Sequence, residues 1–239
     1  VLGMDVIIDM LYRLGLERGI PRVEALTLGA GEYAPLDMAA MYQTIAAGGY
    51  RMPLRSIRDI VDAHGEPLRR YPLEYDRTAS LQAIYLLQYG MQEVVRTGTG
   101  RGVYRYLPDG FTAAGKTGTT NDGRDSWFAG FTGDLLAVSW IGRDDNGGTG
   151  LTGSTGALRV WGHFMSRASR QPFRYRMPDG VAVQWIDETN GHLTGKGCPN
   201  AIMLPFIEGS EPRQRTNCSP RKYGSPKKSW FERLFGGDD

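Results

Sequence analysis

Apolar residues recur at helical spacing in four parts of the chain, and each part predicts a helix. The first helix covers about residues 6–14 and should end at Gly15, since glycine easily adopts the left-handed conformation that closes a helix. The second begins at Pro35, a first-turn proline, and ends at Gly48-Gly49. The third covers about residues 78–95, and the fourth follows Ser154-Thr155 along the apolar positions 157, 160, 161, 164 and 165.

Shorter runs typical of β-strands lie between these helices. Residues 53–72 alternate loosely around the turn signal His64-Gly65 and predict a small hairpin. After Phe111 the runs 112–119, 127–132 and 135–141 follow, and the last two should form a hairpin that turns at Gly133-Asp134. The large aromatic residues of this region are expected in the core of the hairpin: Trp127, Phe128, Phe131 and Trp140.

The composition is that of an ordinary globular protein and argues against several classes of function. Hydrophobic residues make up 41% and charged residues 23% of the 239 positions, which argues against wholesale disorder. The formal net charge is only +2, so the chain as a whole has no strong attraction to nucleic acid or to an anionic membrane. The longest apolar runs fall far short of the roughly 18 residues that a membrane-spanning helix requires.

The two cysteines of the chain, Cys198 and Cys218, both lie in the stretch 172–220, where Gly and Pro recur at short intervals. This spacing predicts a small loop-rich β appendage, followed by a mobile basic tail over 221–239. A disulfide between the cysteines would be worth about 3 kcal/mol and would indicate an oxidising compartment, whereas two buried thiols are the alternative. The histidines at positions 64, 163 and 192 share no ligand spacing with the cysteines, so no metal site is expected.

The densest chemistry lies at residues 110–117, which formally match the phosphate-loop pattern G-x-x-x-x-G-K-[ST]. A phosphate loop must follow a buried strand and open a helix, because backbone N–H groups at the helix N-terminus bind the anion. Residues 106–109 do not resemble a core strand, and the residues after Thr117 are poor helix formers. The sequence therefore disfavours nucleotide binding.

The alternative places Lys116, Thr117, Gly118 and Thr119 on an edge strand that faces a cleft. Gly118 has no Cβ, so a ligand or a neighbouring residue can approach the backbone closely. Lys116 would supply a fixed cation, and the hydroxyl and amide of Thr119 would supply hydrogen-bond donors for a carboxylate or a carbonyl oxygen. Such a set of groups suits acyl transfer.

The chain resembles the penicillin-binding transpeptidases at three successive segments: Lys116-Thr117-Gly118-Thr119, Asp125-Ser126-Trp127-Phe128-Ala129-Gly130-Phe131, and Trp140-Ile141-Gly142-Arg143-Asp144. Residues 28–49, 94–100 and 152–161 resemble the bifunctional class A members, so the resemblance covers about residues 1–170 in the right order. The end with the two cysteines resembles the small C-terminal extension of the b-type proteins of Gram-negative bacteria.

The resemblance implies an α+β fold, with an antiparallel sheet packed against helices, that is incomplete on its N-terminal side. Residues 1–171 would be the C-terminal part of the transpeptidase domain, 172–220 the appendage and 221–239 the tail. The implied function is a D,D-transpeptidase that cross-links peptidoglycan stem peptides through a serine acyl-enzyme and that β-lactams acylate. The parent protein would also be a glycosyltransferase acting on lipid II-derived glycan strands, with cell-wall regulatory proteins among its partners and without cofactors.

The same resemblance implies roles for the four residues of the strand. Lys116 would hold the substrate carboxylate and sustain a positive field, Thr117 would line the strand, and Gly118 would be a spacer. The hydroxyl of Thr119 would contact the terminal carboxylate, and its N–H would form half of the oxyanion hole. One such donor is typically worth about 2.7–4 kcal/mol in the transition state.

Two motifs of the family are missing before Lys116. No Ser-x-x-Lys and no Ser-x-Asn precedes Lys116. The Ser-x-x-Lys at Ser225-Pro226-Lys227-Lys228 follows the strand and contains a proline. We therefore expect the nucleophile, the glycosyltransferase domain and a membrane anchor upstream of Val1, on a protein at the periplasmic face of the inner membrane. This fragment alone would then be inactive. The alternative is a free-standing, non-catalytic module that binds stem peptides or a partner protein.

Overall fold

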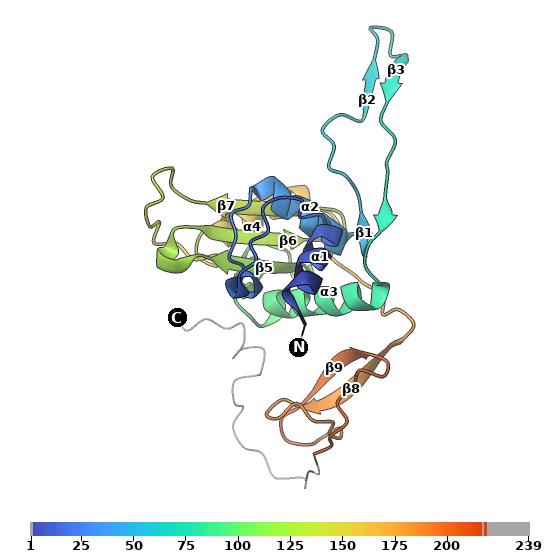
Figure 1. Cartoon of the computed structure of the whole chain (residues 1–239), viewed down its shortest axis with the longest axis vertical. Coiled ribbons are helices and arrows are strands. Elements are labelled where there is room, and N and C mark those ends of the chain that lie inside the picture. The colour runs from blue at the N-terminus through green and yellow to red at the C-terminus, as the bar shows by residue number, and fades with distance from the viewer. Residues whose placement is uncertain (1, 217, 219–239) are drawn as a thin grey trace. The chain divides into compact units, whose positions relative to one another are not determined.

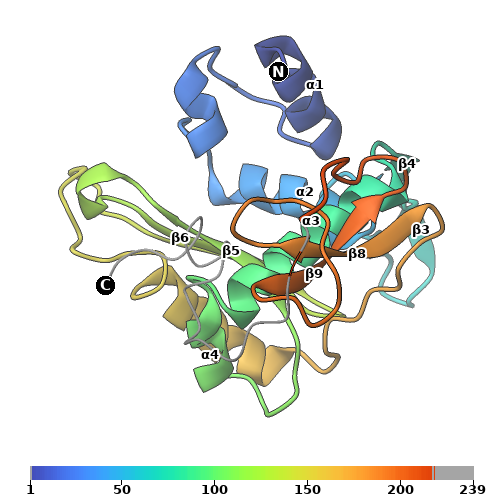
Figure 2. The same ribbon diagram turned by 90° about the horizontal axis from the view of Figure 1, so that it is seen from below.

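The computed structural model describes residues 2–216 and 218, which form two compact units, one up to Ser80 and one from Leu81 onward. Within the described residues no helix is both long enough and apolar enough to cross a membrane. Figures 1 and 2 label the helices and strands of both units.

The first unit contains two α-helices, α1 (Met4–Leu14) and α2 (Pro35–Ala46), and a short 3₁₀ helix at Glu24–Leu28 between them in sequence. Gly15 closes α1 with a φ of 109°, and its amide donates to the carbonyl of Tyr12 at 3.0 Å. Pro35 opens α2, and the Asp37 carboxylate accepts a hydrogen bond from the Ala34 amide at 3.0 Å. Both predicted helices are confirmed.

The strands of the first unit form two antiparallel pairs. Strand β1 (Tyr50–Arg51) pairs with β4 (Asp76–Arg77), and β2 (Asp59–Val61) pairs with β3 (Pro67–Arg70). The Asp62 carboxylate accepts hydrogen bonds from the amides of His64 and Glu66 at 2.8 and 2.9 Å, which closes the turn between β2 and β3. The predicted hairpin is confirmed, and Figure 1 shows it standing clear of α1 and α2.

The second unit is built on a three-stranded antiparallel sheet in the order β5-β6-β7. Its strands are β5 (Ala114–Thr119), β6 (Ser126–Phe131) and β7 (Leu136–Ile141), and β6 and β7 meet at the predicted turn, Gly133-Asp134. Helix α3 (Leu81–Arg96) packs beside β5, and α4 (Ala157–Ala168) packs on β6 and β7. Short 3₁₀ helices occupy Arg101–Arg105 and Asn121–Gly123. Helices packed on an antiparallel sheet make the fold α+β.

The core of the second unit lies between the sheet, α4 and the end of α3. Phe128 is fully buried and meets Trp161 of α4 edge to face, with the ring centroids 5.0 Å apart. The Trp161 indole N–H also donates to the carbonyl of Gly130 at 3.1 Å, which ties α4 to the central strand. The other buried members of this cluster are Val95, Val103, Leu107, Ala113, Ala157, Leu158 and Met165.

The structure corrects two details of the predicted fold and agrees with a third. Trp140 was expected in the hairpin core, but 43% of it is exposed, because it lies on β7 at an edge of the sheet. Helix α3 begins at Leu81 rather than at Thr78, since the Thr78 amide is bonded to the carbonyl of Gly49. Helix α4 begins at Ala157, the first of the predicted apolar positions, and in the turn before it the Thr155 hydroxyl accepts a hydrogen bond from the Thr152 amide.

After α4 the chain forms an antiparallel hairpin of β8 (Val181–Asp187) and β9 (Ala201–Ile207). Cys198 and Cys218 are joined by a disulfide, with their Cα atoms 5.7 Å apart. The bond ties the turn before β9 to the segment that follows the hairpin. The basic tail predicted at 221–239 lies outside the described residues.

The β6–β7 turn carries a carboxylate that holds the end of α4. Asp134 accepts hydrogen bonds from the Ser169 hydroxyl at 2.6 Å, from the Arg170 amide at 2.8 Å and from the Thr132 hydroxyl at 3.0 Å. These donors, the Ser169 hydroxyl first, lower the pKa of Asp134 to about 2. The turn is therefore stabilised by the charged form of the carboxylate.

Replacing both Cys198 and Cys218 by serine should destabilise the β8–β9 hairpin by about 3 kcal/mol, since the disulfide closes a loop with a sequence separation of 20. Hydrogen–deuterium exchange on the complete protein would measure this as faster exchange of peptides within 181–207. Peptides from α4 serve as the internal control and should keep their rates. Unchanged exchange in the hairpin would contradict the prediction.

Asp134→Asn should weaken the β6–β7 turn at neutral pH and make little difference in strong acid. The folded-state pKa lies below the ordinary value of 3.8, so the stabilisation is complete above about pH 4 and is lost as the pH falls toward 2. Hydrogen–deuterium exchange of peptides spanning 131–136, with variant and wild type compared at each pH, would measure the difference. A difference that stays constant from pH 6 to pH 2 would refute it.

Candidate functional site

The residues Lys116, Thr117, Gly118 and Thr119 form the last part of β5, an edge strand of the sheet. β5 pairs with β6 in a regular register, in which Thr117 lies opposite Phe128 and Thr119 opposite Ser126. In the described part of the chain no strand pairs with the other edge of β5. The predicted edge strand is therefore present, and among the described residues one of its two edges has no paired strand.

The local structure does not fit a phosphate loop. Lys116 lies within β5, and the strand continues through Thr119. The first helical turn after it is the three-residue 3₁₀ helix at Asn121–Gly123, in which Asp122 has a φ of 62°. Among the residues that the structure describes, no α-helix begins directly after β5, so there is no helix N-terminus beside Lys116 to bind a phosphate, in agreement with the prediction from the sequence.

Lys116 is half buried on the strand. Its Nζ donates a hydrogen bond to the carbonyl of Thr117 at 2.8 Å. Burial lowers the pKa of its ammonium group below the ordinary value of 10.5, because desolvation disfavours the charged form. A cation in such a place interacts more strongly with an anion than one in water does.

Thr117 is held by the loop that follows α3. The hydroxyls of Thr99 and Thr117 are 2.7 Å apart and form a hydrogen bond. The glycines on either side of Thr99 allow the loop to lie against the end of α3, since a Cβ at Gly98 or Gly100 would come within 3.1 Å of the Val94 backbone. The Gly-Thr-Gly segment thus places one hydroxyl beside the strand.

Thr119, at the end of β5, is exposed and is held by a different loop. The amide of Gly153 donates to the Thr119 hydroxyl at 2.8 Å. The amide of the next residue, Thr120, donates to the carbonyl of Asp125 across the sheet at 3.2 Å. Backbone N–H groups alternate in direction along an extended strand, so the N–H of Thr119 points toward the open edge.

A cluster of polar and aromatic groups fixes the turn after β5. The Asp125 carboxylate accepts hydrogen bonds from the Trp140 indole at 2.9 Å and from the Thr120 hydroxyl at 3.1 Å. Trp140 lies beside Trp127, with ring centroids 6.1 Å apart. A Cβ at Gly118 would come 3.1 Å from the Cβ of Trp127, so Gly118 leaves room for this ring. The Asp125–Trp140 contact gives the exposed indole a structural role.

Other predicted features lie apart from this strand. Cys198 and Cys218 belong to the β8–β9 region, where they are bonded to each other. Among the described residues, no group of three or more histidine, cysteine or acidic side chains is arranged to hold a metal ion.

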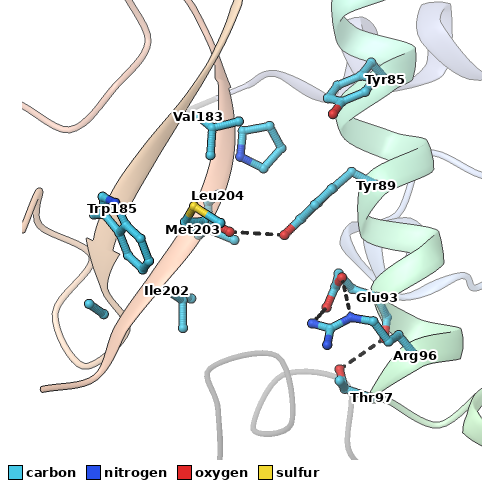
Figure 3. Close-up of a pocket in the computed structure, with 12 residues that line it drawn as sticks. Tyr85, Tyr89, Glu93, Arg96, Thr97, Val183, Trp185, Ile202, Met203 and Leu204 are labelled. Carbon is cyan, nitrogen blue, oxygen red and sulfur yellow. Dashed lines mark hydrogen bonds and ion pairs between the residues drawn. The ribbon is translucent and has the colours of Figure 1, made fainter. Parts of the chain in front are cut away.

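A groove of about 530 Å³ lies between α3 and the β8–β9 hairpin and shares no residue with the Lys116–Thr119 strand (Figure 3). Tyr89 of α3 donates to the carbonyl of Met203 on β9 at 3.1 Å, and burial raises the pKa of this tyrosine to about 12. At one end of the groove the Arg96 Nε donates to the Glu93 carboxylate at 2.8 Å. Apolar side chains of β8 and β9 form the opposite wall, among them Val183, Trp185 and Ile202.

Two residues that hold the hydroxyls of the strand, Thr99 and Gly153, were not predicted from the sequence. Thr99 is 18 residues from Thr117, and Gly153 is 34 residues from Thr119. Both belong to segments whose resemblance to the family was noted, but no spacing rule connects them to β5.

Comparison with known proteins places this geometry in a family. The family model for the penicillin binding protein transpeptidase domain matches residues 22–141, which are 120 of the 239 residues. Penicillin-binding protein 1B of Vibrio cholerae is 35% identical over 98% of the chain, and Penicillin-binding protein 1B of Escherichia coli is 30% identical over 99%. The chain spans only 29% and 31% of the length of these two relatives.

Solved structures agree with the sequence comparison. The crystal structure of Penicillin-Binding Protein 1A from Haemophilus influenzae matches with a TM-score of 0.81 and 26% identity, covering 90% of this chain and 38% of that one. Penicillin-binding protein A of Mycobacterium tuberculosis, in an imipenem acyl-enzyme complex, shares the fold at a TM-score of 0.53 and 18% identity, covering 67% and 42% of the two chains. The resemblance found in the sequence is confirmed: the chain belongs to the penicillin-binding protein transpeptidase family.

Proposed function

We propose that this chain supplies the substrate-binding strand of a peptidoglycan D,D-transpeptidase that works through a serine acyl-enzyme. The observation that carries the proposal is the arrangement on β5, where a half-buried cation and two held hydroxyls lie on an edge strand. An extended stem peptide can align along such an edge through its backbone. The family supplies the class of reaction, and the site supplies the binding groups.

In the proposed reaction the strand binds the donor peptide at its D-Ala-D-Ala end. Lys116 and the hydroxyl of Thr119 hold the terminal carboxylate, and Thr117 lines the strand beside them. The N–H of Thr119, which points to the open edge, forms half of the oxyanion hole. Gly118 acts as the spacer between the two threonines.

The nucleophile comes from a part of the parent protein outside this chain. The serine oxygen forms a bond to the penultimate D-Ala carbonyl carbon, the peptide C–N bond breaks, and the proton goes to the leaving D-Ala amine. An amine of a second stem peptide then attacks the ester, which forms the cross-link and returns the proton to the serine. A β-lactam acylates the same serine, and its ring C–N bond breaks instead.

For the whole protein we propose the organisation that the relatives' greater length suggests. Residues 1–171 are the C-terminal part of the transpeptidase domain, residues 172–220 a small appendage and residues 221–239 a basic tail. The parent also carries a glycosyltransferase domain and a membrane anchor, and it works at the periplasmic face of the inner membrane. Its substrates are stem peptides and glycan strands, and cell-wall regulatory proteins are further partners.

Labelling of the complete protein with a fluorescent penicillin tests this proposal. One equivalent of label that resists denaturation, and that unlabelled benzylpenicillin blocks beforehand, is the expected result. Absence of label would overturn the enzyme proposal and favour a non-catalytic module, which would still bind a stem peptide ending in D-Ala-D-Ala in a direct binding assay.

Lys116→Gln should slow acylation of the complete protein by about 10- to 100-fold, since a hydrogen bond to a charged group is worth about 1.5–3 kcal/mol. Glutamine keeps most of the side-chain length but removes the charge. Stopped-time labelling with fluorescent penicillin gives the second-order rate constant. An unchanged rate constant would remove Lys116 from the binding site.

Thr99→Val should slow acylation by about fivefold, because one neutral hydrogen bond is worth about 1 kcal/mol. Valine matches the shape of threonine but cannot bond to the Thr117 hydroxyl. Thr99→Ser retains the hydroxyl and is the matched control, so it should stay near the wild-type rate in the same labelling assay. Equal rates for the valine and serine variants would contradict a role for this hydrogen bond.

A further inference from the structure

Gly153 lies directly on the backbone of the site. A Cβ at this position would come within 2.7 Å of the Trp127 carbonyl oxygen and within 2.8 and 2.9 Å of the oxygen and nitrogen of Gly118. All three are backbone atoms of paired strands, so they cannot move aside as a flexible side chain would. Only glycine allows the loop before α4 to come this close to β5.

This close approach determines which hydrogen bond the Thr119 hydroxyl accepts and which one it can donate. The Gly153 amide, 2.8 Å away, is a donor only, so the hydroxyl oxygen must act as the acceptor in this contact. The single proton of the hydroxyl is then directed to another acceptor. Because Thr119 is exposed, that acceptor can be a group of a bound ligand.

A buried serine holds the loop in this position. Ser126, opposite Thr119 in the sheet register, is fully buried. Its hydroxyl donates to the carbonyl of Thr152 at 2.7 Å and accepts from the amide of Ala157 at 2.8 Å. These two bonds fix the residues on either side of Gly153 and bind the start of α4 to the sheet.

We propose that Gly153 is a positioning residue for substrate binding: its amide sets the Thr119 hydroxyl as a proton donor toward the carboxylate of a ligand on the β5 edge. This inference rests on the proposed function and goes beyond it, since it assigns the orientation of the hydroxyl to a loop 34 residues away. This orientation of the Thr119 hydroxyl selects a ligand that has a free carboxylate near the carbonyl group that the serine attacks.

The test compares benzylpenicillin with its methyl ester as acylating agents of the complete protein. The ester lacks the anion that the Thr119 hydroxyl would bind. Gly153→Ala should slow acylation by the acid about tenfold and leave the ester rate within about twofold, because a hydrogen bond to a charged group is lost. Thr119→Val should show the same selective loss, and Thr119→Ser should restore most of the preference for the acid.

Two further variants separate positioning from a general structural effect. In the double variant Gly153→Ala/Thr119→Val the acid rate should equal that of Thr119→Val alone, since both changes remove one interaction. Gly90→Ala, in α3, is the matched control, because a Cβ there meets no atom within 4 Å, and it should leave both rates unchanged. If Gly153→Ala does not fold, Ser126→Ala should show the same selective loss with Gly153 intact.

Each outcome distinguishes this inference from the function on which it rests. A wild-type protein that neither compound acylates would overturn both. The wild type could instead be acylated while Gly153→Ala, or its substitute Ser126→Ala, slows acylation by the acid and by the ester equally. This result would overturn the positioning role of Gly153 and leave the proposed transpeptidase function intact. The positioning role would also be overturned if the two substitutions slowed acylation by the acid additively in the double variant.

Discussion

The burial of Phe128 determines how the second unit is assembled. The Phe128 ring lies against two glycines, Gly115 on β5 and Gly130 on β6. A Cβ at Gly115 would come within 2.7 Å of the ring and a Cβ at Gly130 within 2.8 Å, so only glycine leaves room for the ring at these positions. The same ring packs against Trp161, whose indole is bonded to Gly130. Because Trp161 belongs to α4, this contact fixes the helix on the sheet and brings the loop before the helix to the end of β5.

The site is built from one regular strand and two irregular loops, which contribute different groups. The strand supplies a backbone edge, one cation and two threonines at alternate positions, which any extended strand can do. The loops supply what the strand cannot, namely fixed directions for the hydroxyls, through Thr99 on one side and Gly153 on the other. Groups held by neighbouring structure need little reorganisation when a charged ligand binds, and electrostatic stabilisation depends on this property.

Local patterns predicted most elements of the fold, because their causes are local. Pro35 and the Gly133-Asp134 turn act within a few residues of themselves, and the Lys116–Thr119 segment was placed correctly on an edge strand. The exposure of Trp140 could not be predicted from its aromatic character, since it depends on the place of β7 at an edge of the sheet. Two other features join segments that are far apart in sequence: the contact of Gly153 with β5, and the groove beside Tyr89. The spacing of hydrophobic residues along the chain cannot predict such contacts.

The contact of Gly153 with the backbone of β5 also affects the order in which parts of the protein are expected to fold. The hairpin of β6 and β7 closes over a turn of a few residues, and such short closures cost little chain entropy. The hydroxyl of Thr119 acquires its direction only when a segment 34 residues later has docked, which is a slower, non-local event. We therefore expect the β6–β7 hairpin of a newly made chain to form before its binding edge is complete, since that edge also needs the loop before α4 in place.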